Sequence, residues 1–275
     1  MNVSAVWAIL TYTFKDAIRA KWLLVFAVVF FLLAVNIPML VLLAARYLPP
    51  NYLQVYLTTL VGLAFPFIPL LPLPMGAATI VDERESGTLQ YIMSNPISKV
   101  DFLLGRMGGM LAATTAVILL GFGVASLMVY NIDVGRYAPV LTATSLAALL
   151  NAIMLGLAMV ISILTKRKST ATGIAIFMWF LFTVLSDLGF LSIVLNLKAG
   201  AAATLPVILL NPVETSRIFA VLSLGGAADQ LGSTGLIISY YLGENAFSIL
   251  GGTLLAWLAV FFILAFLLFR RQDVV

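Results

Sequence analysis

Charged residues divide the chain into long apolar blocks. Blocks without Asp, Glu, Lys or Arg cover residues 22–45, 47–81, 107–132, 137–165, 169–186 and 245–269. A helix of about 20 residues crosses the roughly 30 Å hydrocarbon core of a bilayer, so each block is long enough to span it. The apolar run 199–213 is too short and is broken by Asn211 and Pro212. The pattern predicts an all-α polytopic membrane protein with six transmembrane helices.

Lysine and arginine residues predict the orientation, because they concentrate on the cytoplasmic side. With both ends of the chain inside, that side holds Lys15, Arg19, Lys21, Arg84, Lys99, Arg106, Lys166, Arg167, Lys168, Arg270 and Arg271. The outer side then holds only Arg46, Arg136, Lys198 and Arg217. We therefore expect an N-in, C-in protein of the cytoplasmic (inner) cell membrane.

Residues 1–275 are predicted to form a single transmembrane domain. Its parts are an interfacial helix (1–21), helices one and two (22–81), a cytoplasmic segment (82–103), helices three to five (104–194), an extracytoplasmic segment (195–244), helix six (245–269) and a cytoplasmic tail (270–275). In the first part, apolar residues recur at helical spacing: Val3, Val6, Trp7, Leu10, Phe14 and Ile18. This favours an amphipathic helix in the inner interface; the alternative is a simple charged anchor for helix one.

Composition excludes several classes of protein. The chain is 63% hydrophobic and 9% charged, which excludes a soluble globule. It has no Cys and no His, so disulfides, thiolate or imidazole metal sites and Ser-His or Cys-His nucleophile pairs are excluded. The basic residues are scattered between apolar blocks, which does not fit a nucleic-acid partner. Ten Met residues suggest copper(I) ligation, but Met in apolar helices is more often packing, so we expect no metal site.

The cytoplasmic segment 82–103 has the clearest pattern. It begins with three carboxylates in four residues, and Leu89, Ile92 and Met93 then form one apolar helical face that ends before Pro96. A short helix of this kind in water is expected to dock its apolar face into a partner. The alternative, a helix resting on lipid headgroups, is disfavoured by the acidic start on an anionic leaflet.

The run from Glu83 to Arg106, with Glu85, Gly87-Thr88-Leu89, Pro96-Ile97-Ser98-Lys99 and Leu104-Gly105-Arg106, resembles the coupling segment of ABC-2 type transporter permeases. The resemblance implies a coupling helix that docks on a cytoplasmic ABC ATPase subunit, which carries ATP and Mg. The implied ATPase-coupling residues are Glu83, Glu85, Gly87, Thr88, Leu89, Ile92, Met93 and Pro96. This chain has no P-loop, so we expect no enzyme activity and no cofactor of its own. We also expect a second copy of the chain as a partner.

A narrower resemblance is to the permeases of ABC systems that mature the copper site of nitrous oxide reductase. It rests on the motifs Trp179-Phe180-Leu181-Phe182, Leu209-Leu210-Asn211-Pro212 and Phe269-Arg270-Arg271. It implies a periplasmic β-helical protein as a further partner. The alternatives are a general ABC-2 exporter of a lipid, drug or other small molecule, a transmitter that moves no solute, and an ion-driven secondary transporter.

Helix two contains four prolines in nine residues: Pro66, Pro69, Pro72 and Pro74. Proline removes backbone donors and breaks helical hydrogen bonds, so this helix must be kinked or unwound. The functional interpretation is a flexible gate or hinge connected to segment 82–103. The alternative is a static kink filled by neighbouring helices.

Two outer features are further candidates. Asn211, Pro212 and Glu214 have the order of a capped helix start, and with Arg217 they are expected to form a docking surface for an extracytoplasmic partner or, alternatively, a lid. Asp187 is the one ionisable residue in or near a predicted span. It is either a functional intramembrane carboxylate or a solvated residue at the end of helix five.

Overall fold

The computed structural model describes residues 2–44, 52–130, 137–185, 204–224 and 233–272. Asp187 and the first residues of the predicted extracytoplasmic segment lie outside this part. Every regular element described is a helix, with no strand among them. In chain order they are α1 (Val3–Arg19), α2 (Lys21–Ala44), α3 (Tyr52–Ala64), η1 (Ile68–Leu70), α4 (Pro72–Glu85), α5 (Thr88–Met93), α6 (Lys99–Tyr130), α7 (Tyr137–Leu164), α8 (Lys168–Phe180), η2 (Leu181–Leu185), α10 (Thr204–Leu210), α11 (Pro212–Ser223), α12 (Ser233–Tyr241), η5 (Gly243–Asn245) and α13 (Ala246–Arg271).

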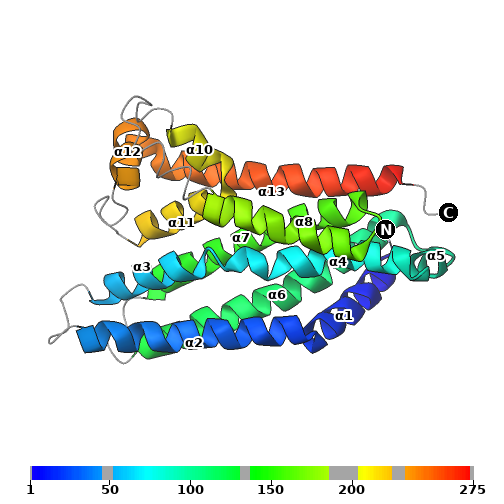
Figure 1. Cartoon of the computed structure of the whole chain (residues 1–275), viewed down its shortest axis with the longest axis horizontal. Helices are drawn as coiled ribbons and strands as arrows, with labels where there is room; N and C mark the ends of the chain where they lie inside the picture. Colours follow the sequence, from blue (N-terminus) through cyan, green and yellow to red (C-terminus); the bar gives the residue numbers. More distant parts are fainter. Residues whose placement is uncertain (1, 45–51, 131–136, 186–203, 225–232, 273–275) are drawn as a thin grey trace.

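The helices form an elongated bundle with two distinct ends (Figure 1). One end carries α5 and both ends of the chain, and the other carries α10 and α12. In an N-in, C-in protein with its coupling segment inside, α5 and both ends of the chain must lie on the same side of the membrane. The arrangement is compatible with that orientation.

Four described helical stretches are long and apolar enough to cross a bilayer: Lys99–Val124, Ala138–Leu164, Lys168–Leu185 and Gly243–Arg271. The helices on either side of the proline cluster add a fifth if they are taken as one span bent by 42°. The stretch Lys21–Leu33 of α2 is apolar but shorter. The protein is therefore a multi-pass, all-α membrane protein, and the sixth span and the orientation stay predictions.

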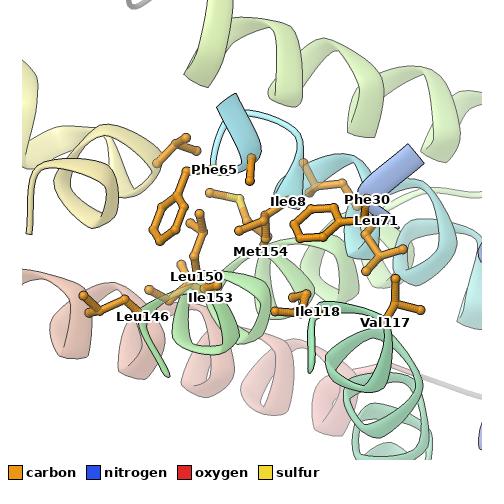
Figure 2. Close-up of a cluster of buried hydrophobic side chains, with 14 of the residues drawn as sticks. Phe30, Phe65, Ile68, Leu71, Val117, Ile118, Leu146, Leu150, Ile153 and Met154 are labelled. Carbon is orange, nitrogen blue, oxygen red and sulfur yellow. The ribbon is translucent and has the colours of Figure 1, made fainter. Parts of the chain in front are cut away.

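The centre of the bundle is α7, which packs against α4, α6, α11 and α13. Its side chains Leu150, Ile153 and Met154 are fully buried and lie among Phe65 and Ile68 from the segment between α3 and α4 (Figure 2). Burial of this apolar surface holds the helices around α7, because side chains that interdigitate gain dispersion contacts that lipid tails do not replace as well.

The packing of α4 on α7 is unusually close. A Cβ atom added at Gly76 would lie 2.7 Å from the Ala158 Cβ. Nearer the α5 end, the buried Ser162 hydroxyl accepts hydrogen bonds from the backbone N–H groups of Ile80 and Val81, at 3.0 and 3.1 Å. The two helices are thus joined by small-residue packing and by hydrogen bonds, so they are expected to move together.

The N-terminal helix α1 packs on α6 along a row of glycines. A Cβ atom at Gly105 would lie 2.7 Å from the Ile9 Cβ, and one at Gly109 would lie 2.5 Å from the Leu10 carbonyl oxygen. Only glycine lets the two backbones approach this closely. Gly105 and Gly109, four residues apart on one face of α6, therefore form the contact with α1.

The opposite face of α1 is exposed. It carries Val3 and Trp7, as the interfacial interpretation expects, whereas Thr13 and Ala17 are buried on the α6 side. The alternative of a simple charged anchor does not account for this packing. α1 is therefore packed on the bundle, and its placement in the membrane interface stays a prediction.

The chain breaks its helix where the prolines lie. α3 ends at Ala64, and after the short helix η1 the chain continues in α4, whose first residue is Pro72. Proline is tolerated there because the N–H group of a first helical residue has no partner within the helix. The predicted kink is confirmed by the 42° bend between the two helical parts.

Two tryptophans from neighbouring helices form hydrogen bonds with backbone carbonyls in the break between α3 and α4. The Trp179 indole of α8 donates to the Pro66 carbonyl oxygen at 2.8 Å, and the Trp22 indole of α2 donates to the Leu70 carbonyl oxygen at 3.1 Å. These contacts are what the static interpretation of the kink expects. A gating role for Pro66, Pro69, Pro72 and Pro74 stays a prediction.

Candidate functional site

The candidate site is the α5 junction, defined as α5 with its flanking residues 82–87 and 94–99. Gly87, the residue before α5, has a φ of +75°, a left-handed conformation that other residues rarely adopt. This turn redirects the chain out of α4, and the helix of Thr88–Met93 then ends two residues before Asn95. Pro96 follows, as expected of a residue that disfavours helical geometry just before it.

The apolar face of α5 packs against this chain itself. Leu89 is 3% exposed, and Ile92 and Met93 lie against a cluster that includes Phe102 of α6 and Phe269 of α13. Leu89 is thus covered within the chain, whereas Ile92 and Met93 are half-buried, and an ATPase-coupling role for these three residues stays a prediction. The bundle already supplies an apolar surface for them, because the start of α6 and the end of α13 meet at the junction.

The outward face of α5 is instead polar and aromatic. Tyr91 is 76% exposed, and Gln90, Ser94, Asn95 and Pro96 are exposed beside it. Sequence reasoning missed Tyr91, although its position two residues after Leu89 on a helix places it on the opposite face. This outward face is the part of the junction that a partner can contact.

Glu83 is buried in an ion pair with Arg106 of α6. The two side chains are 8% and 6% exposed as residues, and the Arg106 guanidinium also donates to the Thr13 hydroxyl of α1 at 3.2 Å. The same guanidinium lies 5.4 Å from the centre of the Tyr12 ring. The Glu83 carboxylate therefore faces inward and joins α4 to α6 and α1, and its ATPase-coupling role stays a prediction.

The other two carboxylates at the end of α4 bind the start of α8. The Lys168 ammonium group lies 2.8 Å from Asp82 Oδ2, and the Lys168 backbone N–H donates to Glu85 Oε2 at 2.9 Å. A carboxylate is favoured at this place, since the first N–H groups of a helix lack internal partners and carry partial positive charge. Both carboxylates remain exposed. Glu85 thus keeps the accessible position that the sequence assigned to it.

Arg84 connects the junction to the ends of α7 and α13. Its guanidinium donates to the Thr165 carbonyl oxygen at 2.9 Å and to Gln272 Oε1 at 2.6 Å. Gln272 in turn donates to the Ile163 carbonyl oxygen at 2.7 Å, and Lys99 donates to the Gln272 carbonyl oxygen at 2.5 Å. Sequence reasoning missed Gln272, because nothing local indicates that the end of α13 returns to α7.

These bonds connect the α5 junction to five helices: α1, α6, α7, α8 and α13. Arginine and lysine make most of them with backbone carbonyls and carboxylates, which are strong acceptors for charged donors. The α5 junction is therefore linked by side-chain contacts to most of the bundle.

At the opposite end, the predicted helix start is confirmed. The Asn211 side chain accepts hydrogen bonds from the Val213 and Glu214 backbone N–H groups at 2.9 and 3.3 Å. Its amide also donates to the Phe182 carbonyl oxygen of the π-helical turn η2, at 2.6 Å. Asn211 thus caps α11 and fixes it to the end of α8.

The predicted docking surface at this end is only partly on the surface. Asn211 and Pro212 are buried where α11 packs against α7 and α13, and a docking role for them stays a prediction. Glu214 and Arg217 are less buried and form two hydrogen bonds with each other at 2.6 and 2.9 Å. A docking role for these two residues stays a prediction.

The described residues contain no group of three or more His, Cys, Asp or Glu side chains placed to hold a metal ion. The residues gathered at the α5 junction are instead hydrogen-bonding and ion-pairing groups that hold helices together.

Comparison with known proteins shows the family to which the chain is similar. The family model described as "ABC-2 family transporter protein" matches residues 7–274. The chain is also similar to two curated proteins named "Probable ABC transporter permease protein NosY", from Stutzerimonas stutzeri and Pseudomonas aeruginosa. Each is 31% identical over 277 residues, covering 98% of this chain and 99% of the relative.

Proposed function

The chain belongs to the ABC-2 transporter family, and on this premise we propose that it is a permease subunit driven by a separate cytoplasmic ABC ATPase. The ATPase subunit carries ATP and Mg, and two copies of the chain assemble in the inner cell membrane. The sequence has no P-loop with which to bind ATP itself.

The observation that carries the proposal is the construction of the α5 junction. Its outward face, centred on Tyr91, is exposed, while its inward face is packed on the bundle. Tyrosine is among the residues most often found at energetic centres of protein interfaces. A subunit bound to this face pushes on a helix whose base is joined to α7 and α8 through Arg84 and Glu85.

A narrower proposal concerns what the transporter serves. We infer that it acts in copper-site maturation of nitrous oxide reductase, together with a periplasmic β-helical protein. The similarity to two NosY proteins over nearly the whole chain supports this assignment. The extracytoplasmic partner would then approach the end of the bundle that carries α10 and α12, opposite α5 (Figure 1).

The affinity for the ATPase subunit tests the main proposal. The complex is purified from native membranes in mild detergent. The affinity of the isolated ATPase is then measured for the wild-type permease and for the Tyr91→Ala permease. Loss of an interface tyrosine is expected to weaken binding roughly tenfold or more. Tyr240→Ala is the matched control, because Tyr240 is 82% exposed in α12 at the other end. Absence of an ATPase from the wild-type complex, or equal affinity in Tyr91→Ala, contradicts the proposal.

The β-helical partner is tested separately by identifying the proteins that copurify with the wild-type complex. Its presence supports the narrower proposal. If the ATPase copurifies without it from cells that produce nitrous oxide reductase, the maturation role is contradicted and a general ABC-2 exporter remains.

A further inference from the structure

Basic side chains gather around the end of α13, at the end of the bundle that carries α5 (Figure 1). The Arg84 guanidinium donates both to the Thr165 carbonyl oxygen and to Gln272 Oε1, so it holds the turn between α7 and α8 next to the end of α13. Lys99 at the start of α6 donates to the Gln272 carbonyl oxygen. We call the six basic residues at or next to these contacts the basic cluster: Arg84, Lys99, Lys166, Arg167, Arg270 and Arg271.

Two pairs in the basic cluster are available to bind an anion. One pair lies in the turn after α7 and the other in the last turn of α13: Lys166 with Arg167, and Arg270 with Arg271. All four side chains are exposed, and their charged groups make no hydrogen bond or ion pair within the described residues. Each pair therefore presents two charged donors to a ligand.

The remaining charges of the basic cluster are not neutralised within the described part of the chain. Arg84 and Lys99 donate to carbonyl and amide oxygens, which carry no net charge. Lys168 is paired with Asp82 and is therefore not counted. Asp273 follows in the sequence, outside the described residues, and would offset only one of the six positive charges. The cluster is thus a strong local excess of positive charge.

The basic cluster lies where the apolar spans of the bundle end. Two stretches long enough to cross a bilayer end beside it, at Leu164 and Arg271, and two begin beside it, at Lys99 and Lys168. The ends of membrane spans lie at the level of the lipid headgroups, where basic residues meet phosphate groups. A lipid is therefore within reach of the cluster.

Exposed leucines follow the basic pairs into the spans. On α13, Leu264, Leu267 and Arg271 are spaced by three and four residues, so they share one face of the helix. Both leucines are exposed, as is Leu164 at the end of α7, which packs against α13. Each basic pair thus has an apolar surface beside it for an acyl chain. An acidic protein surface would neutralise the charges without contacting these leucines.

We propose that the basic cluster binds a lipid with two phosphates, a diphosphatidylglycerol (cardiolipin). One phosphate binds the Arg270 and Arg271 pair, the other binds the Lys166 and Arg167 pair, and the acyl chains lie along the leucines. Charge-assisted hydrogen bonds to phosphate are strong, and two basic pairs on two packed helices match two phosphates joined through one glycerol. Binding does not need the ATPase, so the proposal stands or falls separately from the proposed function.

The test uses the full-length protein without ATPase, freed of native lipid in mild non-ionic detergent at about 150 mM salt. The rise of the thermal unfolding midpoint is measured during titration with cardiolipin, phosphatidylglycerol, phosphatidylcholine or inorganic phosphate, compared at equal concentrations of phosphate. A ligand that binds the folded state raises the midpoint as its occupancy increases. Because its two phosphates are linked, cardiolipin should act at a concentration about tenfold or more below phosphatidylglycerol. Phosphatidylcholine and inorganic phosphate should have little effect.

Two double variants remove the basic pairs separately: Arg270→Gln with Arg271→Gln, and Lys166→Gln with Arg167→Gln. Each should weaken cardiolipin binding about tenfold or more and abolish the preference over phosphatidylglycerol, because one phosphate loses its cations. Lys15→Gln with Arg19→Gln is the matched control, since it removes two exposed charges from α1, outside the basic cluster. Each midpoint is compared with the lipid-free value of the same variant, which separates lipid binding from intrinsic stability.

Each outcome decides the proposal. A preference for cardiolipin that both pair variants lose and the control keeps supports it. Equal action of cardiolipin and phosphatidylglycerol, or a loss in only one pair variant, shows that one phosphate is sufficient and overturns it. Equal stabilisation by phosphatidylcholine or inorganic phosphate, or an equal loss in the α1 control, also overturns it. The comparison of ligands on the wild-type protein holds even if a variant is poorly produced.

Discussion

Replacing Glu83 by glutamine removes the counter-charge of a buried arginine. In the folded protein, Arg106 is 6% exposed and forms an ion pair with Glu83, while Asp16 acts on it electrostatically. Glu83→Gln keeps the volume and one carbonyl acceptor but removes the carboxylate that forms the ion pair with the guanidinium. The Thr13 hydrogen bond at 3.2 Å and the Tyr12 ring contact remain.

The expected cost is large because both groups are shielded from water. Breaking a buried ion pair by removing one partner costs about 3–5 kcal/mol. Glutamine keeps a hydrogen-bond acceptor, so we expect the lower end, about 3 kcal/mol, which is roughly a hundredfold in the folding equilibrium. With about 2–4 °C per kcal/mol for a chain of this size, the unfolding midpoint should fall by about 6–12 °C.

The assay is thermal unfolding of the purified protein in mild detergent, with Glu85→Gln as the matched control. Glu85 is two residues away and exposed, and its contact with the Lys168 N–H group is worth less than about 1 kcal/mol. The reasoning is refuted if the two variants unfold at the same temperature. A double-mutant cycle with Arg106→Met should show a coupling of the same order.

Three further variants and one control test the helix packing, the proline break and a helix cap. Gly109→Ala should lower stability by about 1–3 kcal/mol, because its Cβ would lie 2.5 Å from a backbone oxygen of α1, whereas Gly123→Ala, with open space around it, should not. Trp179→Phe should lower the free energy of unfolding by about 1–3 kcal/mol, because it leaves the Pro66 carbonyl without its indole donor. Equal stability of the variant would show that this hydrogen bond does not stabilise the break between α3 and α4. Asn211→Ala should cost about 1–2 kcal/mol through loss of the helix cap, measured by the same unfolding assay.

Local features of the fold could be predicted from the sequence. The start of α11 follows from Asn211 and Pro212, since capping depends on residues within one turn. The break before α4 follows from its prolines for the same reason. Both depend on backbone chemistry at the residues concerned, so no knowledge of the tertiary structure is needed.

Features that depend on contacts between residues far apart in the chain could not be predicted from the sequence. Glu83 and Glu85 look alike in the sequence, but one faces Arg106 inside the bundle and the other caps α8 at its surface. The apolar face around Leu89 was recognised in the sequence, but its contact with the start of α6 and the end of α13 was not. An apolar periodicity shows that a face is covered and does not show by what.

Site-directed cross-linking between α5 and the ATPase tests the central claim most directly. The chain has no cysteine, so Ser94→Cys introduces a single thiol on the exposed face of α5, and Ser248→Cys introduces one at an exposed position near the start of α13 as a control. With a short thiol-reactive cross-linker, we expect a product between the ATPase and Ser94→Cys and none with Ser248→Cys. The claim is contradicted if Ser94→Cys gives no cross-link in a complex that contains the ATPase.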